Sequence, residues 1–343
     1  MSTNTKTIVV DLYGADDAPG VMLDGARDAL KKDKTVHVTL VGDADTINGY
    51  FAAQKGADMS RVAVVHAPGQ VTNEDVPTQV VRTKPDSSLV TCLNLLRSDE
   101  NAAALVSCGS TGAVLMGGTL VVGRLPGVKR PALAPVMPTV DRKQVILVDC
   151  GANVDCRPAF LLQFAVLGVS YMKAMCGIEN PRVGLLSNGT EDKKGNEQTH
   201  AAFALLKGSG LNFVGNMEAR DLNSGRYDVV VADGFAGNIA LKSLEGAIGM
   251  YTRVLKEEIN AAGIAKLGAL LLKKTFARLK SRMDYTEMGG AAFLGCNKVI
   301  IKSHGSSKAS TICASILKAK AMVDAGATEK MQQELALYGN QAD

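Results

Sequence analysis

The chain contains no tryptophan, and its aromatic residues are limited to 8 phenylalanines and 7 tyrosines. A protein that binds single-stranded nucleic acid by base stacking needs more aromatic surface than this. An excess of one charge is also missing, because 38 Lys and Arg residues against 34 Asp and Glu residues leave a net charge of +4. The composition therefore excludes a generally polybasic nucleic-acid-binding protein and leaves room only for a local basic patch.

Paired cysteines and long apolar runs are absent as well. The 7 cysteines are odd in number and form no C-x-x-C pair, which argues against a disulfide framework and against a zinc ribbon. The N-terminal segment MSTNTKTIVVDLYG has no signal-peptide core, and no run of 18 apolar residues occurs. We therefore expect a reduced, soluble, cytoplasmic protein that needs no metal and no cofactor.

Several common catalytic motifs are also missing. The sequence has no Walker A motif, no G-x-S-x-G, no H-E-x-x-H and no complete G-x-G-x-x-G with its acidic partner. These absences argue against a P-loop kinase, a serine hydrolase, a zinc protease and an ordinary dinucleotide-dependent dehydrogenase.

Short Val-, Ile- and Leu-rich runs alternate with amphipathic stretches along the whole chain. Strands are expected at 7–12, 36–41, 62–66, 103–107, 133–137, 145–148, 183–186, 212–214, 229–232 and 299–302. Helices are expected at 21–31, 45–55, 88–98, 113–122, 158–175, 196–207, 238–261 and 310–325. This alternation predicts an α/β protein in three layers, with a mainly parallel sheet between helices and the whole of 1–343 as one domain.

Six of the expected strands run into loops of Gly, Ser, Thr, Asn and Asp. These loops lie at 9–20, 105–113, 147–155, 184–197, 230–238 and 300–310. Ligands of open parallel sheets bind outside the carboxyl ends of the strands, where helix N-termini favour an anion. Each loop alone is also what any strand-to-helix turn prefers. Six together predict a phosphate-binding cleft.

The loop sequences, taken in order, resemble those of the PlsX family of phosphate acyltransferases. The resemblance rests on VSCGSTGA, LVDCGAN, GLLSNGTEDKKGNE, FVGNMEARDL, VVADGFAGNIALKSLEG, MGGAAFLG and HGSS, and it spans nearly the whole chain. Two segments depart from the family pattern. The usual DAMGGD-like opening is Asp11-Leu-Tyr-Gly-Ala-Asp16, and the Gly-Gly-Ala motif continues with Ala292-Phe293-Leu294-Gly295.

The resemblance implies an enzyme that converts acyl-[acyl carrier protein] and inorganic phosphate into acyl phosphate and free carrier protein. It implies a fold like that of the isocitrate and isopropylmalate dehydrogenases, assembled as a homodimer that supplies phospholipid synthesis. It also suggests a downstream glycerol-3-phosphate acyltransferase as a partner. Two alternatives stay open: phosphotransacylation of a short acyl-CoA, and a non-catalytic scaffold for lipid enzymes at the membrane.

The resemblance points to a set of site residues on the six loops. Lys193 and Lys194 are the candidates to bind phosphate and neutralise charge, although the same residues suit a solvated turn. Asn238 either donates to an oxyanion or caps a helix. His304 either donates to an anion or caps a helix. The expected lining of the cleft is Gly109, Ser110, Thr111, Gly112, Asp149, Asn153, Asp233, Gly237, His304, Ser306 and Ser307.

Cys108 suggests a competing mechanism through an acyl-cysteine intermediate. It follows an expected strand and precedes a helix N-terminus, which lowers the pKa of a thiol. The alternative is a small apolar residue at the mouth of the sheet. Direct attack by phosphate needs no such nucleophile, so we expect Cys108 to be structural. An apolar groove for the acyl chain is expected near Gly289–Leu294.

The segment 264–282, IAKLGALLLKKTFARLKSR, differs from the rest of the chain. It carries six basic residues and no acidic residue, and its apolar residues recur at roughly helical spacing. It is either an ordinary surface helix packed on the core or a basic amphipathic helix that contacts an anionic membrane or an acidic partner. We expect peripheral membrane contact on the cytoplasmic face.

Overall fold

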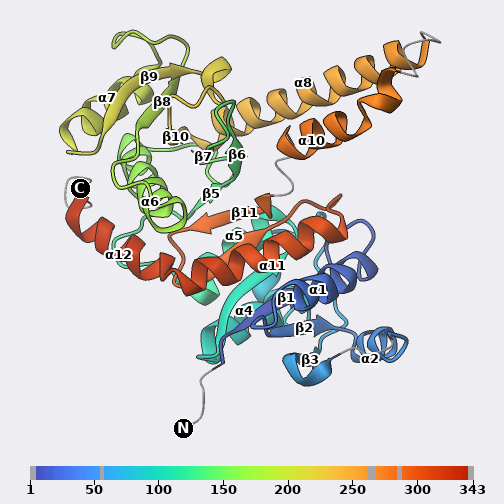
Figure 1. Cartoon of the computed structure of the whole chain (residues 1–343). Helices are drawn as coiled ribbons and strands as arrows, with labels where there is room; N and C mark the ends of the chain where they lie inside the picture. The colour runs from blue at the N-terminus through green and yellow to red at the C-terminus, as the bar shows by residue number, and fades with distance from the viewer. Residues whose placement is uncertain (1–4, 55–57, 262–267, 284–287, 339–343) are drawn as a thin grey trace.

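The computed structural model describes residues 5–54, 58–261, 268–283 and 288–338. The chain folds into two lobes, each built around its own sheet (Figure 1). The mainly parallel strands and their covering helices confirm the predicted α/β class. Two sheets rather than one, however, share the predicted strands.

The first sheet has seven strands in the order β3-β2-β1-β4-β12-β11-β5. Their bounds are β1 Thr7–Asp11, β2 Val38–Gly42, β3 Val62–His66, β4 Ala102–Ser107, β5 Ala132–Ala134, β11 Ala291–Leu294 and β12 Val299–Lys302. The first five strands in this order are parallel, whereas β11 runs antiparallel to both of its neighbours. Apolar residues on both faces of β1 explain its burial, since Ile8 and Val10 join one core cluster and Val9 joins another.

The second sheet has five strands in the order β6-β7-β10-β8-β9. Their bounds are β6 Val136–Pro138, β7 Gln144–Val148, β8 Val183–Ser187, β9 Phe213–Glu218 and β10 Val229–Val231. All neighbours are parallel except β6 and β7. Ile146 and Val148 face the same core cluster as the middle of helix α6 (Pro158–Cys176). Leu147 packs with Leu241 of helix α8 (Gly234–Ala261) on the opposite side.

Helices cover both sheets. The α-helices are α1 Gly20–Lys32, α2 Ala44–Ala52, α3 Val80–Thr83, α4 Ser88–Ser98, α5 Thr111–Gly117, α6 Pro158–Cys176, α7 Glu197–Gly208, α8 Gly234–Ala261, α10 Lys273–Met283, α11 Ala309–Asp324 and α12 Ala327–Tyr338. Short turns of 3-10 helix lie at Met59–Arg61 and Ala219–Asp221, and a turn of π-helix lies at Gly118–Val122. Helices α1 and α11 pack together on the first sheet, and α12 packs on α6 of the second lobe.

Helix α6 is apolar along most of its length, although Gln163 and Lys173 interrupt its apolar run. Within the part of the chain that the structure describes, it is the one helix long and apolar enough to cross a membrane. In the folded protein, however, 67% of its apolar stretch is buried. Phe164 and Leu167 lie in the core that joins the two lobes. Its apolar composition is therefore explained by a position between other elements of the fold.

Helix α8 is the longest helix, with 28 residues, and it leaves the body of the protein. Its buried residues end at Leu241, in the second turn. In Figure 1 the outer part of α8 projects from the second lobe, with α10 beside it. The predicted basic segment 264–282 falls here. Residues 264–267 lie outside the described residues, and the rest contains α10.

Several elements differ from the sequence predictions, and two of the differences in boundary have identifiable reasons. The apolar run 133–137 was expected as one strand, but Pro135 separates β5 of one sheet from β6 of the other. The short strand β11 was not expected. Helix α8 begins at Gly234 rather than at Asn238, because Asp233 provides the N-terminal cap.

Candidate functional site

The six predicted loops separate into two groups of three, each following neighbouring strands. The loops after β1, β4 and β12 form the first loop group, and these strands are adjacent in the first sheet. The loops after β7, β10 and β8 form the second loop group, and these strands are adjacent in the second sheet. Parallel strands bring their carboxyl ends to one edge, so each group occupies a single place in its lobe.

Asp11, at the end of β1, organises the first loop group. Its buried carboxylate accepts hydrogen bonds from Ser88 Oγ at 2.5 Å, from Ser107 Oγ at 2.7 Å and from the Tyr13 amide at 3.3 Å. Burial raises the pKa of Asp11 above its ordinary value, while these hydrogen bonds and the charge of Lys302 act in the opposite direction. Asp11 therefore ties the β1 loop to β4 and to α4.

Two close backbone contacts hold the loops of the first group together. Gly14 has a φ of +89°, and a Cβ there would lie 2.5 Å from the Gly109 backbone. The Asp16 amide donates to the Gly305 carbonyl at 2.8 Å. The β1 loop is thus pressed against the β4 loop on one side and against the β12 loop on the other.

The predicted phosphate-cradling residues lie at the start of α5. Ser110 precedes the helix and makes no side-chain capping hydrogen bond, so its hydroxyl is available to a ligand. Ser110, Thr111 and Gly112 are half-buried, and the Gly109 amide is held by Ser107 Oγ at 3.0 Å. Amides at a helix start attract an anion, which fits the predicted role.

Lys302 is a candidate that the sequence analysis missed. It is the last residue of β12, and its Nζ donates to the carbonyl oxygens of Cys108, at 3.4 Å, and Ser303. Burial lowers the pKa of this lysine, and the nearby Lys242 adds to the decrease. Its position directly before the Ser-His-Gly loop could have indicated a role in the site. A lysine at the end of an apolar strand, however, is also common where a strand simply reaches the surface.

His304 and Ser306 contact each other in the β12 loop. The Ser306 amide donates to His304 Nδ1 at 3.2 Å, which leaves Nε2 as the ring nitrogen that carries the proton. The Ser306 hydroxyl lies 2.8 Å from the same Nδ1. Lys308, not His304, is the N-terminal cap residue of α11, so the helix-capping alternative for His304 is wrong.

Cys108 is poorly suited to act as a nucleophile. Its side chain is 3% exposed, and its sulfur lies 3.7 Å from the sulfur of Met22. Burial raises the pKa of the Cys108 thiol to about 12. Since the reactive form is the thiolate, this environment supports the structural interpretation of Cys108.

Asp149 organises the second loop group from the end of β7. It is 0% exposed, and its two oxygens accept five hydrogen bonds. The donors are the amides of Leu133 at 2.7 Å, Cys150 at 2.7 Å, Ala152 at 3.4 Å and Asn153 at 2.6 Å, and Asn153 Nδ2 at 3.1 Å. Burial raises the pKa of Asp149 to about 6, although these hydrogen bonds act against the increase. Asp149 therefore orients loop amides.

Asn153 also acts through other residues of the loop. Its side-chain amide donates to the Pro131 carbonyl at 2.9 Å as well as to Asp149. Its own carbonyl accepts the Gly234 amide at 2.7 Å. Asn153 thereby joins the β5 region, the β7 loop and the first residue of α8.

The first turn of α8 is pressed directly onto the β7 loop. A Cβ on Gly237 would lie 2.0 Å from the Asp149 carbonyl oxygen. Asp233 Oδ1 caps the helix by accepting the Ala236 amide at 2.7 Å. Asn238 therefore lies inside the helix, and the alternative that it caps α8 is wrong. Its exposed side chain lies beside Gly151, with Cγ 3.6 Å from where a Cβ on that glycine would be.

Lys193 and Lys194 extend from the β8 loop and are exposed. The Lys194 amide donates to the Glu191 carbonyl at 2.9 Å, which closes a turn, and Asn216 Nδ2 donates to the Lys194 carbonyl at 3.3 Å. In the described part of the chain neither Nζ forms an ion pair. Asn216 was not predicted, because its position in β9 gives no sequence signal for a role in a loop.

The two lobes contact each other beside both loop groups. The amide of Leu133, in the edge strand β5 of the first sheet, donates to Asp149 of the second. Lys242, on α8 of the second lobe, lies close enough to Lys302 of the first to influence its pKa. The carboxylates of Asp11 and Asp149 are already engaged with donors of their own loops.

We predict that the contact between α8 and the β7 loop tolerates no side chain. Gly237→Ala should lower the free energy of unfolding by about 1–3 kcal/mol or more, because the methyl group displaces the helix. The matched control is Gly246→Ala in the same helix, where a Cβ meets nothing within 4 Å. It should stabilise the protein by about 0.5–1 kcal/mol. Urea denaturation measures both, and equal stabilities would contradict the prediction.

Solved structures with a similar fold include acyl-transferring enzymes. An EutD phosphotransacetylase from Staphylococcus aureus has a TM-score of 0.59 at 18% identity and covers 93% of this chain and 95% of its own. A protein described as a 4-hydroxythreonine-4-phosphate dehydrogenase, from Salmonella typhimurium, has a TM-score of 0.52 at 13% identity, with coverage of 93% and 99%. These similarities confirm the predicted fold class.

Sequence comparison identifies the family as well as the fold. The phosphate acyltransferase of Bacillus cereus (strain B4264) is 45% identical over 316 residues, which cover 92% of this chain and 94% of that protein. The phosphate acyltransferase of Geobacillus thermodenitrificans (strain NG80-2) is equally similar, at 45% over 316 residues. The profile of a family described as fatty acid synthesis protein matches residues 6–330. The chain belongs to this family, whose matching members are phosphate acyltransferases.

Proposed function

We propose that the chain transfers the acyl group of an acyl-[acyl carrier protein] to inorganic phosphate, giving acyl phosphate and free carrier protein for phospholipid synthesis. The observation that carries this proposal is the 45% identity to phosphate acyltransferases over 92% of the chain. The whole chain acts as one catalytic unit, since both lobes contribute a loop group to the site. A downstream glycerol-3-phosphate acyltransferase would consume the product.

The proposed reaction is a direct displacement at the thioester carbonyl. A phosphate oxygen attacks the carbonyl carbon, a carbon–oxygen bond forms, and the carbon–sulfur bond breaks as the carrier's thiolate leaves. Ser110 and Thr111 bind the phosphate together with the helix-start amides, and the lysines neutralise its charge. Asn238 donates to the developing oxyanion from the outer surface of α8. Positioning and charge stabilisation account for the catalysis, and no covalent enzyme intermediate is required.

A comparison of donors tests this function. Long-chain acyl carrier protein should release free carrier protein only when phosphate is present. Faster turnover of acetyl-CoA would favour the alternative, which is phosphotransacylation of a short acyl-CoA. No phosphate-dependent release from any donor would leave the scaffold alternative.

We predict that the β8-loop lysines serve catalysis rather than stability. Replacing Lys193 and Lys194 together with alanine should lower turnover by about a hundredfold, the scale of losing one charge-stabilising donor. The single variants should differ sharply. Their melting temperatures should stay unchanged, because exposed loop lysines contribute little to stability. Lys34→Ala, an exposed lysine before β2, is the control. Near-normal activity of the double variant would remove both lysines from the mechanism.

We further propose that the basic segment 264–282 brings the enzyme to an anionic membrane on the cytoplasmic side. Leu270, Leu271 and Leu272 are 68%, 87% and 50% exposed, so the described part of this segment is not a core helix. Lys273, Lys274 and Arg278 follow and are also exposed. Adjacent apolar and basic surface of this kind suits insertion combined with attraction to anionic lipid.

We predict that substitutions of the leucines and of the basic residues have different effects on membrane binding and on carrier-protein binding. Leu271→Ser with Leu272→Ser should abolish binding to anionic liposomes and leave the KM for acyl carrier protein largely unchanged, because only the membrane contact needs apolar insertion. Changing Lys273, Lys274 and Arg278 to Glu should weaken both the binding to anionic liposomes and the binding of the acidic carrier protein. Added salt should weaken the same two contacts. Flotation assays and steady-state kinetics measure the two effects. Liposome binding that survives the leucine changes would exclude the proposed insertion.

We also propose that the exposed side of α8 pairs with a second copy of the chain. Phe235, Ile239, Met250, Tyr251 and Val254 are large apolar residues that α8 leaves exposed. Apolar surface that continues along a helix in this way is typical of a protein interface.

We predict that the parent protein is a homodimer and that Met250→Glu with Val254→Glu makes it monomeric, since two buried carboxylates would be left unpaired. Leu337→Glu, at an exposed leucine of α12, should leave the dimer intact. Sedimentation velocity distinguishes these states. A monomeric parent protein would contradict the prediction.

A further inference from the structure

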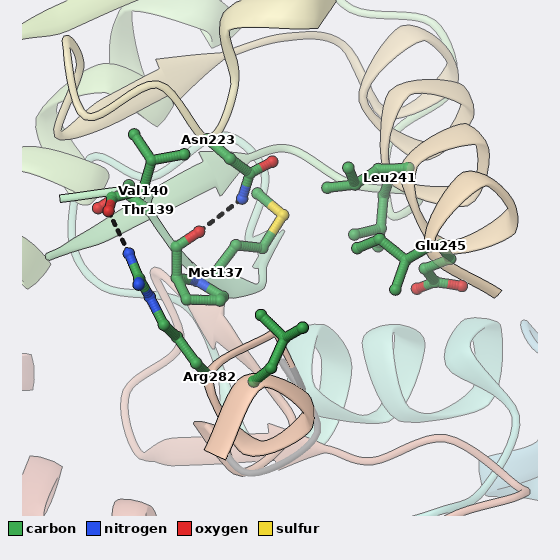
Figure 2. A pocket seen from close by; sticks show the side chains of 11 residues that line it. Met137, Thr139, Val140, Asn223, Leu241, Glu245 and Arg282 are labelled. Atoms are coloured by element: carbon green, nitrogen blue, oxygen red, sulfur yellow. Dashed lines mark hydrogen bonds between the residues drawn. The ribbon is translucent and has the colours of Figure 1, made fainter. Parts of the chain in front are cut away.

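An apolar cavity of about 310 Å³ lies between the edge of the second sheet and the helices α8 and α10 (Figure 2). Met137 lines it from β6, and Leu241, Leu244 and Ile248 line it from α8. Leu279 of α10 lies opposite them. This size falls within the range of roughly 300–1,000 Å³ that is usual for pockets that bind small ligands.

The polar residues around the cavity are already engaged with other groups. Asn223 Nδ2 donates to the Pro138 carbonyl at 2.6 Å, and the Arg282 guanidinium donates to the Val140 carbonyl, as the dashed lines in Figure 2 show. Glu245 pairs with Lys242 at 2.8 Å. Thr139 Oγ donates to Asp141 at 2.5 Å. The described lining therefore presents hydrocarbon, and a phosphate or a sugar would find few partners there.

The cavity is lined by the same helix, α8, that carries Asn238 of the candidate site. Asn238 lies one turn of α8 before Leu241, and Leu241 to Ile248 spans about 10 Å at the usual helical rise. Lys242 and Glu245 influence the pKa of Cys150, the residue after Asp149, which places this part of α8 next to the β7 loop. A ligand with its reactive end at Asn238 thus reaches the cavity within two turns of the helix.

The acyl groove predicted near Gly289–Leu294 gains no support from Phe293 and Leu294. Both side chains, in β11, are buried in the protein core. The cavity beside α8 is an apolar space that begins one helical turn beyond Asn238.

We propose that this cavity holds the hydrocarbon chain of the acyl donor, with the thioester at Asn238 and the chain running along α8 between Leu244 and Leu279. The proposal rests on the proposed function and adds the location of the acyl chain. Transfer of each methylene group from water into such a space strengthens binding about fourfold. A long-chain donor is therefore bound by its chain as well as by its carrier protein.

The absence of tryptophan makes a direct test available. Leu279→Trp would place the single tryptophan of the chain at the wall of the cavity, and bromine atoms quench indole fluorescence only at short range. The probe is acyl carrier protein that carries a dibrominated stearoyl chain, compared with the unbrominated stearoyl form, without lipid. Leu337→Trp, at an exposed leucine of α12 outside the cavity lining, is the matched control.

The brominated donor should quench at least half of the Leu279→Trp fluorescence at saturation and leave Leu337→Trp unchanged. Val140→Trp, at a residue that also lines the cavity, is a second reporter if Leu279→Trp does not fold. Phosphate-dependent release of carrier protein is measured on the same samples. Turnover without quenching in either reporter would overturn the acyl site alone. No turnover from the parent protein would overturn the proposed function and the acyl site together.

Discussion

The carboxylate of Asp149 is the interaction on which the cleft depends. It is fully buried at the junction of the two lobes, and it accepts one amide from β5 of the first sheet and four donors from its own loop. A carboxylate in such a place is costly unless its oxygens are satisfied. Its pKa, raised to about 6 by burial, shows that the surrounding donors only partly offset the loss of water.

Because Asp149 fixes the β7 loop, it also fixes the start of α8. Gly237 rests on the Asp149 carbonyl oxygen, and the Gly234 amide bonds to Asn153 of the same loop. Asp11 has the corresponding role in the first lobe, where it holds Ser88 and Ser107. Each lobe thus uses a buried acid to orient backbone amides and hydroxyls of its own loops. In the proposed mechanism, the lysines bind the anion.

Local sequence signals predicted the loops well but not the way the lobes share the strands. Gly, Ser and Asp after an apolar run reveal a strand-to-helix turn, because that turn depends on nearby residues only. The chain passes from one sheet to the other at Pro135, which lies inside an apolar run that looks like a single strand. Asn238 looked like a cap because it follows the glycine-rich loop Asp233-Gly-Phe-Ala-Gly237, and only the structure shows that Asp233 takes that role. Lys302 could not be predicted as a site residue, because its neighbours Lys242 and Cys108 are distant in sequence.

Helix α8 has three parts with different surroundings. Its first turn needs glycine at Gly234 and Gly237 to approach the β7 loop, and these glycines set where Asn238 lies. Two turns later the same helix presents Leu241, Leu244 and Ile248 to the apolar cavity. Farther out its apolar side chains are exposed and lead toward the basic segment. Since a helix advances by a fixed rise per residue, the part of α8 that lines the cavity, Leu241 to Ile248, spans about 10 Å. In the proposed arrangement, one helix therefore connects the reacting thioester at Asn238, the acyl chain in the cavity and the exposed apolar surface beyond it.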